Sequence, residues 1–120
     1  MGLYNFQKRF APMIMAGTKM HTIRAERAHP DKPGNILYLY TGLRQKGAQL
    51  LKRVRCTKIE RIEIDVDQSI SIDGIYLSVD EEEALARLDG FRDFLDFCEF
   101  WDGRRPFKGQ VIHWKELGEN

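Results

Sequence analysis

The chain has 120 residues, of which 42% are hydrophobic and 31% are charged. These values are typical of one folded domain, residues 1–120, and exclude collagen-like, low-complexity and disordered chains. No apolar run is long enough to span a bilayer, and no secretory signal develops. Two cysteines are too few for a disulfide framework or a Cys-rich zinc site. We therefore expect a cytoplasmic domain without membrane association.

The net charge of +1 conceals two oppositely charged halves. Residues 1–61 hold 13 Lys or Arg and 3 Asp or Glu, a net charge of +10. Residues 62–120 hold 6 basic and 15 acidic residues, a net charge of −9. The first half is suited to facing a polyanion such as RNA. Alternatively, the two halves neutralise each other within one domain.

The first predicted elements are short. Leu3–Phe10 has the aromatic content of a strand, and Phe10–Ala16 predicts a short helix ended by Gly17. Met20–Arg24 follows, with a β-branched pair and no helical period, which indicates an extended segment. The proline- and glycine-rich stretch 29–34 predicts a turn.

Strands dominate the middle of the chain. Asn35–Thr41 is too short and too aromatic for an independent helix and predicts a strand. Gln49–Ile64 predicts one or two strands, and Ser69–Leu77 predicts a β-rich segment interrupted at Asp73-Gly74. Asp65 and Asp67 are expected to share one face of a strand, where a solvent-exposed edge is favoured over a metal site.

The acidic half begins with two predicted helices. Ser78 and Glu81 form a capping box for a helix to about Leu88, and an amphipathic helix follows over 91–101. Phe107–Trp114 predicts a final strand. This element order predicts the α+β class, as a small mixed β-barrel or half-barrel with helices packed on one side.

The segment 9–24 is the most informative for chemistry. Gly17 allows Lys19 to lie in a turn, whereas Thr22 and Arg24 share one face of the strand that follows. An amine, a hydroxyl and a guanidinium would then lie close together. The alternative is a solvated turn lysine, an ordinary strand threonine and a surface arginine. Cys56 and Cys98 are predicted to be buried and unreactive.

This segment resembles the opening motif of the ASCH domain family, which has a PUA-like fold. The shared positions are Phe6, Arg9-Phe10 and Ala16-Gly17-x-Lys19-x-x-Thr22-Ile23-Arg24. Residues 32–35 resemble the family's Lys-x-Gly-Asp turn with Asn35 in place of Asp, and residues 88–91 its Glu-Gly-Phe junction with Asp89 in place of Glu. The resemblance covers roughly residues 4–114.

The resemblance implies a role in RNA or nucleoside chemistry. One bacterial branch of the family hydrolyses N4-acetylcytidine without a cofactor, which implies Lys19, Thr22 and Asp89 as catalytic residues. Asp89 is one methylene shorter than the Glu of that branch, which shifts its carboxylate by about 1.5 Å. The candidates for substrate binding are Arg24, Arg9, Phe6 and Tyr40, with Tyr38 or Trp114 as further stacking surfaces.

The expected reaction is cleavage of the N4-acyl amide, with Lys19 as base and either Thr22 or a water as nucleophile. The substrate would be a small modified nucleoside. A non-catalytic RNA-binding module is the alternative, because Lys52, Arg53, Arg55 and Lys58 cluster in the basic first half. A metal-independent ribonuclease is a third hypothesis, in which Lys19 would again be the base.

Overall fold

The computed structural model describes residues 2–118. Its elements are β1 (Gly2–Phe6), a 3₁₀ turn (Lys8–Phe10), α1 (Ala11–Ala16), β2 (His21–Arg24), β3 (Ile36–Thr41), β4 (Gln49–Ile64), β5 (Ile70–Ile72), β6 (Ile75–Tyr76), α2 (Val79–Leu88), α3 (Phe94–Trp101) and β7 (Phe107–Glu116). This is the predicted α+β class. None of the helices in residues 2–118 has the length and apolarity that crossing a membrane requires.

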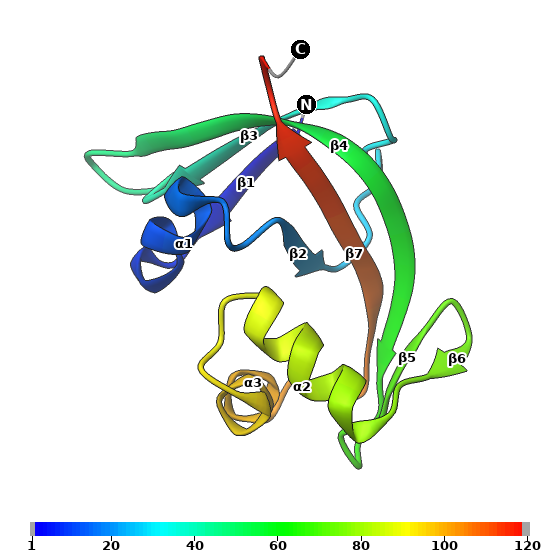
Figure 1. The fold of residues 1–120 in the computed structure, drawn as a ribbon. Coiled ribbons are helices and arrows are strands. Elements are labelled where there is room, and N and C mark those ends of the chain that lie inside the picture. The colour runs from blue at the N-terminus through cyan, green and yellow to red at the C-terminus, as the bar shows by residue number, and fades with distance from the viewer. Residues whose placement is uncertain (1, 119–120) are drawn as a thin grey trace.

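The strands form one curled, mixed sheet. β1 pairs in parallel with β3, β3 pairs antiparallel with β4, and β7 joins β4 to the short strand β2. Figure 1 shows the sheet arching over α2 and α3, which lie together on its concave side, while α1 packs near β4. The sheet is therefore a half-barrel with helices on one side, as the element order predicts.

β4 is the longest strand, and it pairs with different neighbours along its length. Its first residues pair with β3, and Val54–Ile64 pair with β7. A bulge between Cys56 and Lys58 interrupts the register with β7. Bulges increase the local twist of a strand, which suits a strand that bends around a barrel. Gln49–Ile64, expected as one or two strands, is thus a single bent strand.

A continuous apolar core fills the space between the sheet and the helices. Most of its fully buried members come from β1, β3, β4 and β7, among them Tyr4, Leu37, Val54, Ile62 and Val111. Phe97 and Trp101 of α3 and Ala86 of α2 close the core from the helix side. The predicted burial of Cys56 and Cys98 is confirmed, and both are free thiols.

Local turn chemistry explains where the helices begin and end. Gly17 ends α1 with a φ of 78°, a left-handed conformation that glycine adopts at little cost. Ser78 and Glu81 form the predicted capping box at the start of α2, which ends at Leu88 as expected.

Three expected boundaries were wrong. β1 ends at Phe6, because the 3₁₀ turn over 8–10 removes the end of the predicted strand. Asp65 and Asp67 lie in the turn between β4 and β5 and not on a strand face, since the chain must reverse there for β4 to pair with β5. Phe91 precedes α3, because Asp93 caps that helix through the Asp96 N–H.

Candidate functional site

A cavity of about 300 Å³ opens between the sheet and the helix layer. It lies where β2 faces the residues that follow α2 and α3. Its lining combines aromatic rings with a few polar groups: Asn5, Phe6, Gln7, Phe10, Lys19, Thr22, Ile23, Arg24, Ala25, Asp89, Phe91, Phe100, Trp101, Arg104 and Phe107. This mixture of apolar walls and convergent polar groups is typical of small-molecule sites.

Lys19 is the most unusual of the lining residues, because its side chain is buried although it carries an amine. The residue is only 2% exposed and lies in the turn between α1 and β2, as its spacing from Gly17 predicts. Its Nζ donates to the carbonyl oxygen of His21 at 2.9 Å, and to the carbonyl oxygen and Oδ1 of Asp89 at 2.6 and 2.7 Å. Three acceptors occupy the three N–H bonds of an ammonium group.

Burial lowers the pKa of the Lys19 amine. The Asp89 carboxylate opposes this effect, whereas the neighbouring Arg24 lowers the pKa of Lys19 further. The pKa of Lys19 is lowered overall, because the free-energy cost of removing an ammonium ion from water exceeds the stabilisation by the single carboxylate. A lysine with a lowered pKa can act as a base or nucleophile nearer to neutral pH.

Asp89 is the partner that orients Lys19. It follows the last residue of α2, so its carbonyl oxygen belongs to the negative end of the helix dipole, a favourable place for an ammonium group. Burial alone would raise the pKa of the Asp89 carboxyl, but Lys19 and His21 outweigh burial and hold that pKa below its usual value. No hydrogen bond within residues 2–118 reaches its second oxygen, Oδ2, which leaves one carboxylate oxygen for a ligand.

Thr22 and Arg24 form a second polar pair in the cavity. The two residues share a face of β2, as strand alternation predicts, and Arg24 Nε donates to Thr22 Oγ1 at 2.9 Å. Arg24 Nη2 also donates to the carbonyl oxygen of Asn5 at 2.7 Å. Because Thr22 Oγ1 accepts from Arg24, the hydroxyl proton of Thr22 remains free for another acceptor.

Lys19 and Thr22 line the same cavity but are not hydrogen-bonded to each other. No hydrogen bond links Lys19 Nζ to Thr22 Oγ1 in the described structure. Proton transfer from Thr22 to Lys19 therefore requires a bridging water, or a rotation of Nζ away from one of its three acceptors.

Aromatic rings provide the flat surfaces of the cavity. Phe6 and Phe10 lie under the Lys19 ammonium, 5.7 and 5.1 Å from Nζ to the ring centroids. The Arg24 guanidinium lies 4.7 Å from the centroid of Phe6. The rings of Trp101 and Phe107, whose centroids are 4.5 Å apart, also line the cavity. A planar ligand would find π surfaces of the kind on which heterocyclic bases stack.

Two predicted substrate-binding residues lie outside this cavity. Arg9 forms an ion pair with Asp96 of α3, and its guanidinium lies over Phe10 and Phe91. Tyr40 is half-buried on β3, because strand alternation directs Leu39 and not Tyr40 to the core. The cavity lining thus includes Lys19, Thr22, Asp89, Arg24 and Phe6 of the predicted set and omits Arg9 and Tyr40.

The further stacking candidates also belong elsewhere. Trp114 is buried in the core with its ring edge-on to Phe6, and Tyr38 is half-buried on β3. Phe100, Trp101 and Phe107 supply further rings from α3 and β7, and no sequence pattern marked them as site residues. The same holds for His21, whose Nε2 lies 3.3 Å from Asp89 Oδ1 without the alignment of a hydrogen bond.

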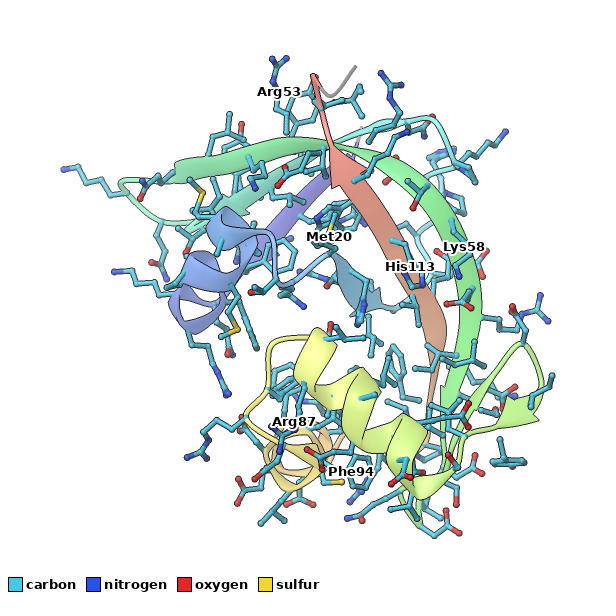
Figure 2. The ribbon with its side chains drawn as sticks, viewed as in Figure 1. Met20, Arg53, Lys58, Arg87, Phe94 and His113 are labelled. Carbon is cyan, nitrogen blue, oxygen red and sulfur yellow. The ribbon has the colours of Figure 1, made fainter. Side chains whose placement is uncertain are left out.

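The basic cluster of β4 is largely engaged within the protein. Lys52 pairs with Glu116 at 2.6 Å, Lys58 lies 3.7 Å from Glu60, and Arg55 donates to the carbonyl oxygen of Gly34. Figure 2 shows Arg53 projecting from the outer side of the sheet, away from the helices. Part of the basic charge of the first half is therefore neutralised internally.

Across residues 2–118, His, Cys, Asp and Glu nowhere gather in a group of three or more that could hold a metal ion. Comparison of the chain with family models, with curated proteins and with solved structures finds no match.

Proposed function

We propose that the protein is an amidohydrolase that cleaves the N4-acyl amide of N4-acetylcytidine-type nucleosides, and that it is an ASCH-type domain. The observation that carries the proposal is the convergence of a buried lysine of lowered pKa, a carboxylate and a Thr–Arg pair on one aromatic cavity. The half-barrel with helices on one side supports the resemblance to a PUA-like fold. The cavity volume is at the lower end of the range for small-molecule sites, which suits one nucleoside.

The first step of the proposed reaction uses Lys19 as the base. In its neutral form, the amine removes a proton from Thr22 Oγ1 or from a water in the cavity. The resulting oxygen nucleophile attacks the acyl carbon, a C–O bond forms, and the carbonyl electrons move onto oxygen. Arg24 lies beside Thr22 and stabilises the developing negative charge.

The second step releases cytidine. The C–N4 bond breaks, and the departing N4 atom takes the proton that Lys19 accepted. Asp89 holds the Lys19 ammonium in place through Oδ1 and its carbonyl oxygen. With water as nucleophile the carboxylate leaves directly. With Thr22 as nucleophile, a water hydrolyses the acyl-threonine ester in a further step.

The test is an ultraviolet assay of N4-acetylcytidine hydrolysis, since the acylated and free bases absorb differently. We expect turnover by the wild-type protein and loss of at least about 100-fold in Lys19→Ala, the typical contribution of a general base. Added ethylamine should restore part of the activity, because a small amine can occupy the space of the deleted side chain. Rescue by an amine separates a chemical role from a structural one.

A control variant and a nucleophile variant complete the test. Lys108→Ala removes an exposed lysine of β7 and should keep full activity. Thr22→Val abolishes activity if Thr22 is the nucleophile and spares most of it if water is. No hydrolysis of N4-acetylcytidine by the wild-type protein, also with longer acyl groups, would refute the proposed function.

A further inference from the structure

A second cavity of about 300 Å³ adjoins the first at Asn5 and Arg24. Its lining comes from β1, from the end of β2 and the segment that follows it, and from the β3–β4 connection: Leu3, Asn5, Arg24, Arg27, Gly42, Leu43, Arg44 and Gln45. Three of these eight residues are arginines, and none is acidic. The second cavity therefore has a strongly cationic lining.

Two of the arginines, Arg24 and Arg27, are positioned by neutral groups. The guanidinium groups of Arg24 and Arg27 lie 5.5 and 4.0 Å from the ring centroid of Tyr4. Arg27 donates to the carbonyl oxygen of Leu3 at 2.6 Å, and Arg24 donates to Asn5 and Thr22. These acceptors are uncharged, so they position the guanidinium groups without neutralising them.

The nearby carboxylates are engaged elsewhere. Asp31 accepts hydrogen bonds from the Tyr4 hydroxyl and from Asn35, and Asp89 accepts from Lys19 through Oδ1. Within residues 2–118, no ion pair reaches Arg24, Arg27 or Arg44. Like charges brought together without counterions repel each other, and a bound anion would remove that cost.

We infer that the cavity lined by Arg24, Arg27 and Arg44 binds a phosphate group of the same ligand whose base occupies the first cavity. This inference deepens the proposed function and rests on it for the identity of the base. The substrate would be a phosphorylated N4-acylcytidine rather than the free nucleoside. The ribose would lie near Arg24 and Asn5, where the two cavities meet, and the phosphate would face the three arginines.

Two sources of phosphate share this chemistry, a mononucleotide and an oligonucleotide. Calorimetric titrations with cytidine, cytidine 5′-monophosphate, cytidine 3′-monophosphate and a short cytidine oligonucleotide distinguish them. We expect a monophosphate to bind about tenfold more tightly than cytidine, as charge-assisted hydrogen bonds allow. Tighter binding of the oligonucleotide than of either monophosphate would identify a polynucleotide as the source.

The variants Arg44→Gln and Arg27→Gln test the cavity itself. Arg44 is exposed and makes no ion pair or side-chain hydrogen bond within the described residues, so its loss should leave the fold intact. We expect the preference for phosphate to fall about threefold in Arg44→Gln and to disappear in the double variant. The matched control is Arg92→Gln, which removes the same charge from a side chain that is 80% exposed and outside both cavities.

The titrations use reaction products and therefore do not depend on turnover. The phosphate site and the amidohydrolase activity can then be refuted independently of each other. Equal affinity for cytidine and its monophosphates, or a preference that survives in the double variant, would overturn the phosphate site. Absence of hydrolysis with an intact phosphate preference would overturn the amidohydrolase proposal alone.

Discussion

At the scale of single residues, the burial of Lys19 together with Asp89 has a consequence for stability. Removing one member of a buried ion pair leaves the other charge without compensation and costs about 3–5 kcal/mol. We predict this loss in the unfolding free energy of Lys19→Met and of Asp89→Asn. The double variant should lose much less than the sum. Urea unfolding of all four proteins measures the coupling, and additive losses would show that the two charges act independently.

The lowered pKa of Lys19 predicts the pH dependence of the reaction. Only the neutral amine accepts a proton, so kcat/KM should fall as the pH falls through the pKa of Lys19. Because burial lowers this pKa, the fall should occur below pH ~10.4, the ordinary value for lysine. A pH–rate profile from pH 5 to 11 locates it. A rate that still rises in proportion to hydroxide above pH ~10.4 would contradict the prediction.

Some residues of the site could be predicted from the sequence, and others could not. Lys19, Thr22 and Arg24 lie within six consecutive positions of the chain, and turn and strand geometry predict their proximity. Asp89 meets Lys19 across 70 positions of the chain, a contact that no local pattern specifies. The rings of Phe100, Trp101 and Phe107 follow helix and strand periodicities that fit any core, so their role in the cavity lining was not visible.

At the scale of elements, the close approach of β2 to β7 depends on a glycine. A Cβ at Gly109 would lie 2.4 Å from the carbonyl oxygen of Arg24 and 2.6 Å from the Phe107 ring. Since the first of these neighbours is backbone, β2 itself would have to move. We predict that Gly109→Ala costs about 3 kcal/mol or more in unfolding free energy and displaces Arg24 from Thr22.

The control for Gly109→Ala lies in the same strand, β7. Lys108→Ala changes the preceding, exposed residue and should alter the unfolding free energy by no more than about 0.5 kcal/mol. Chemical denaturation and the chemical shift of the Thr22 amide report both effects. A stable Gly109→Ala protein with an unshifted Thr22 amide would show that the two strands can separate without cost.

Elements with caps or strong periodicity were predictable, whereas boundaries set by tertiary pairing were not. The capping box fixed the start of α2, and Gly17 fixed the end of α1. The early end of β1 depends on its pairing with β3, and the length of β4 depends on two different partners. These pairings bring together segments that are distant in sequence, so local propensity does not determine them.

At the scale of the whole molecule, the opposite charges of the two halves are joined within one structure. Arg9 pairs with Asp96, Lys19 with Asp89, and Lys52 with Glu116, each across the division between the halves. β4 contains the boundary between the two halves, at residues 61 and 62. The ten-residue strand β7, from the acidic half, pairs antiparallel with β4. Neither half has a complete sheet of its own.

This arrangement predicts one cooperative unfolding transition. The two tryptophans report different elements, since Trp101 of α3 packs on Phe97 and Phe107, whereas Trp114 of β7 packs on Phe6 of β1. In Trp101→Phe and Trp114→Phe, the remaining tryptophan reports one region alone. Fluorescence and far-ultraviolet circular dichroism should give the same urea midpoint within each variant, because two-state unfolding makes all probes coincide. Separate midpoints for fluorescence and dichroism would mean that the barrel and the helix layer unfold independently, and that the cavity between them opens before the sheet is lost.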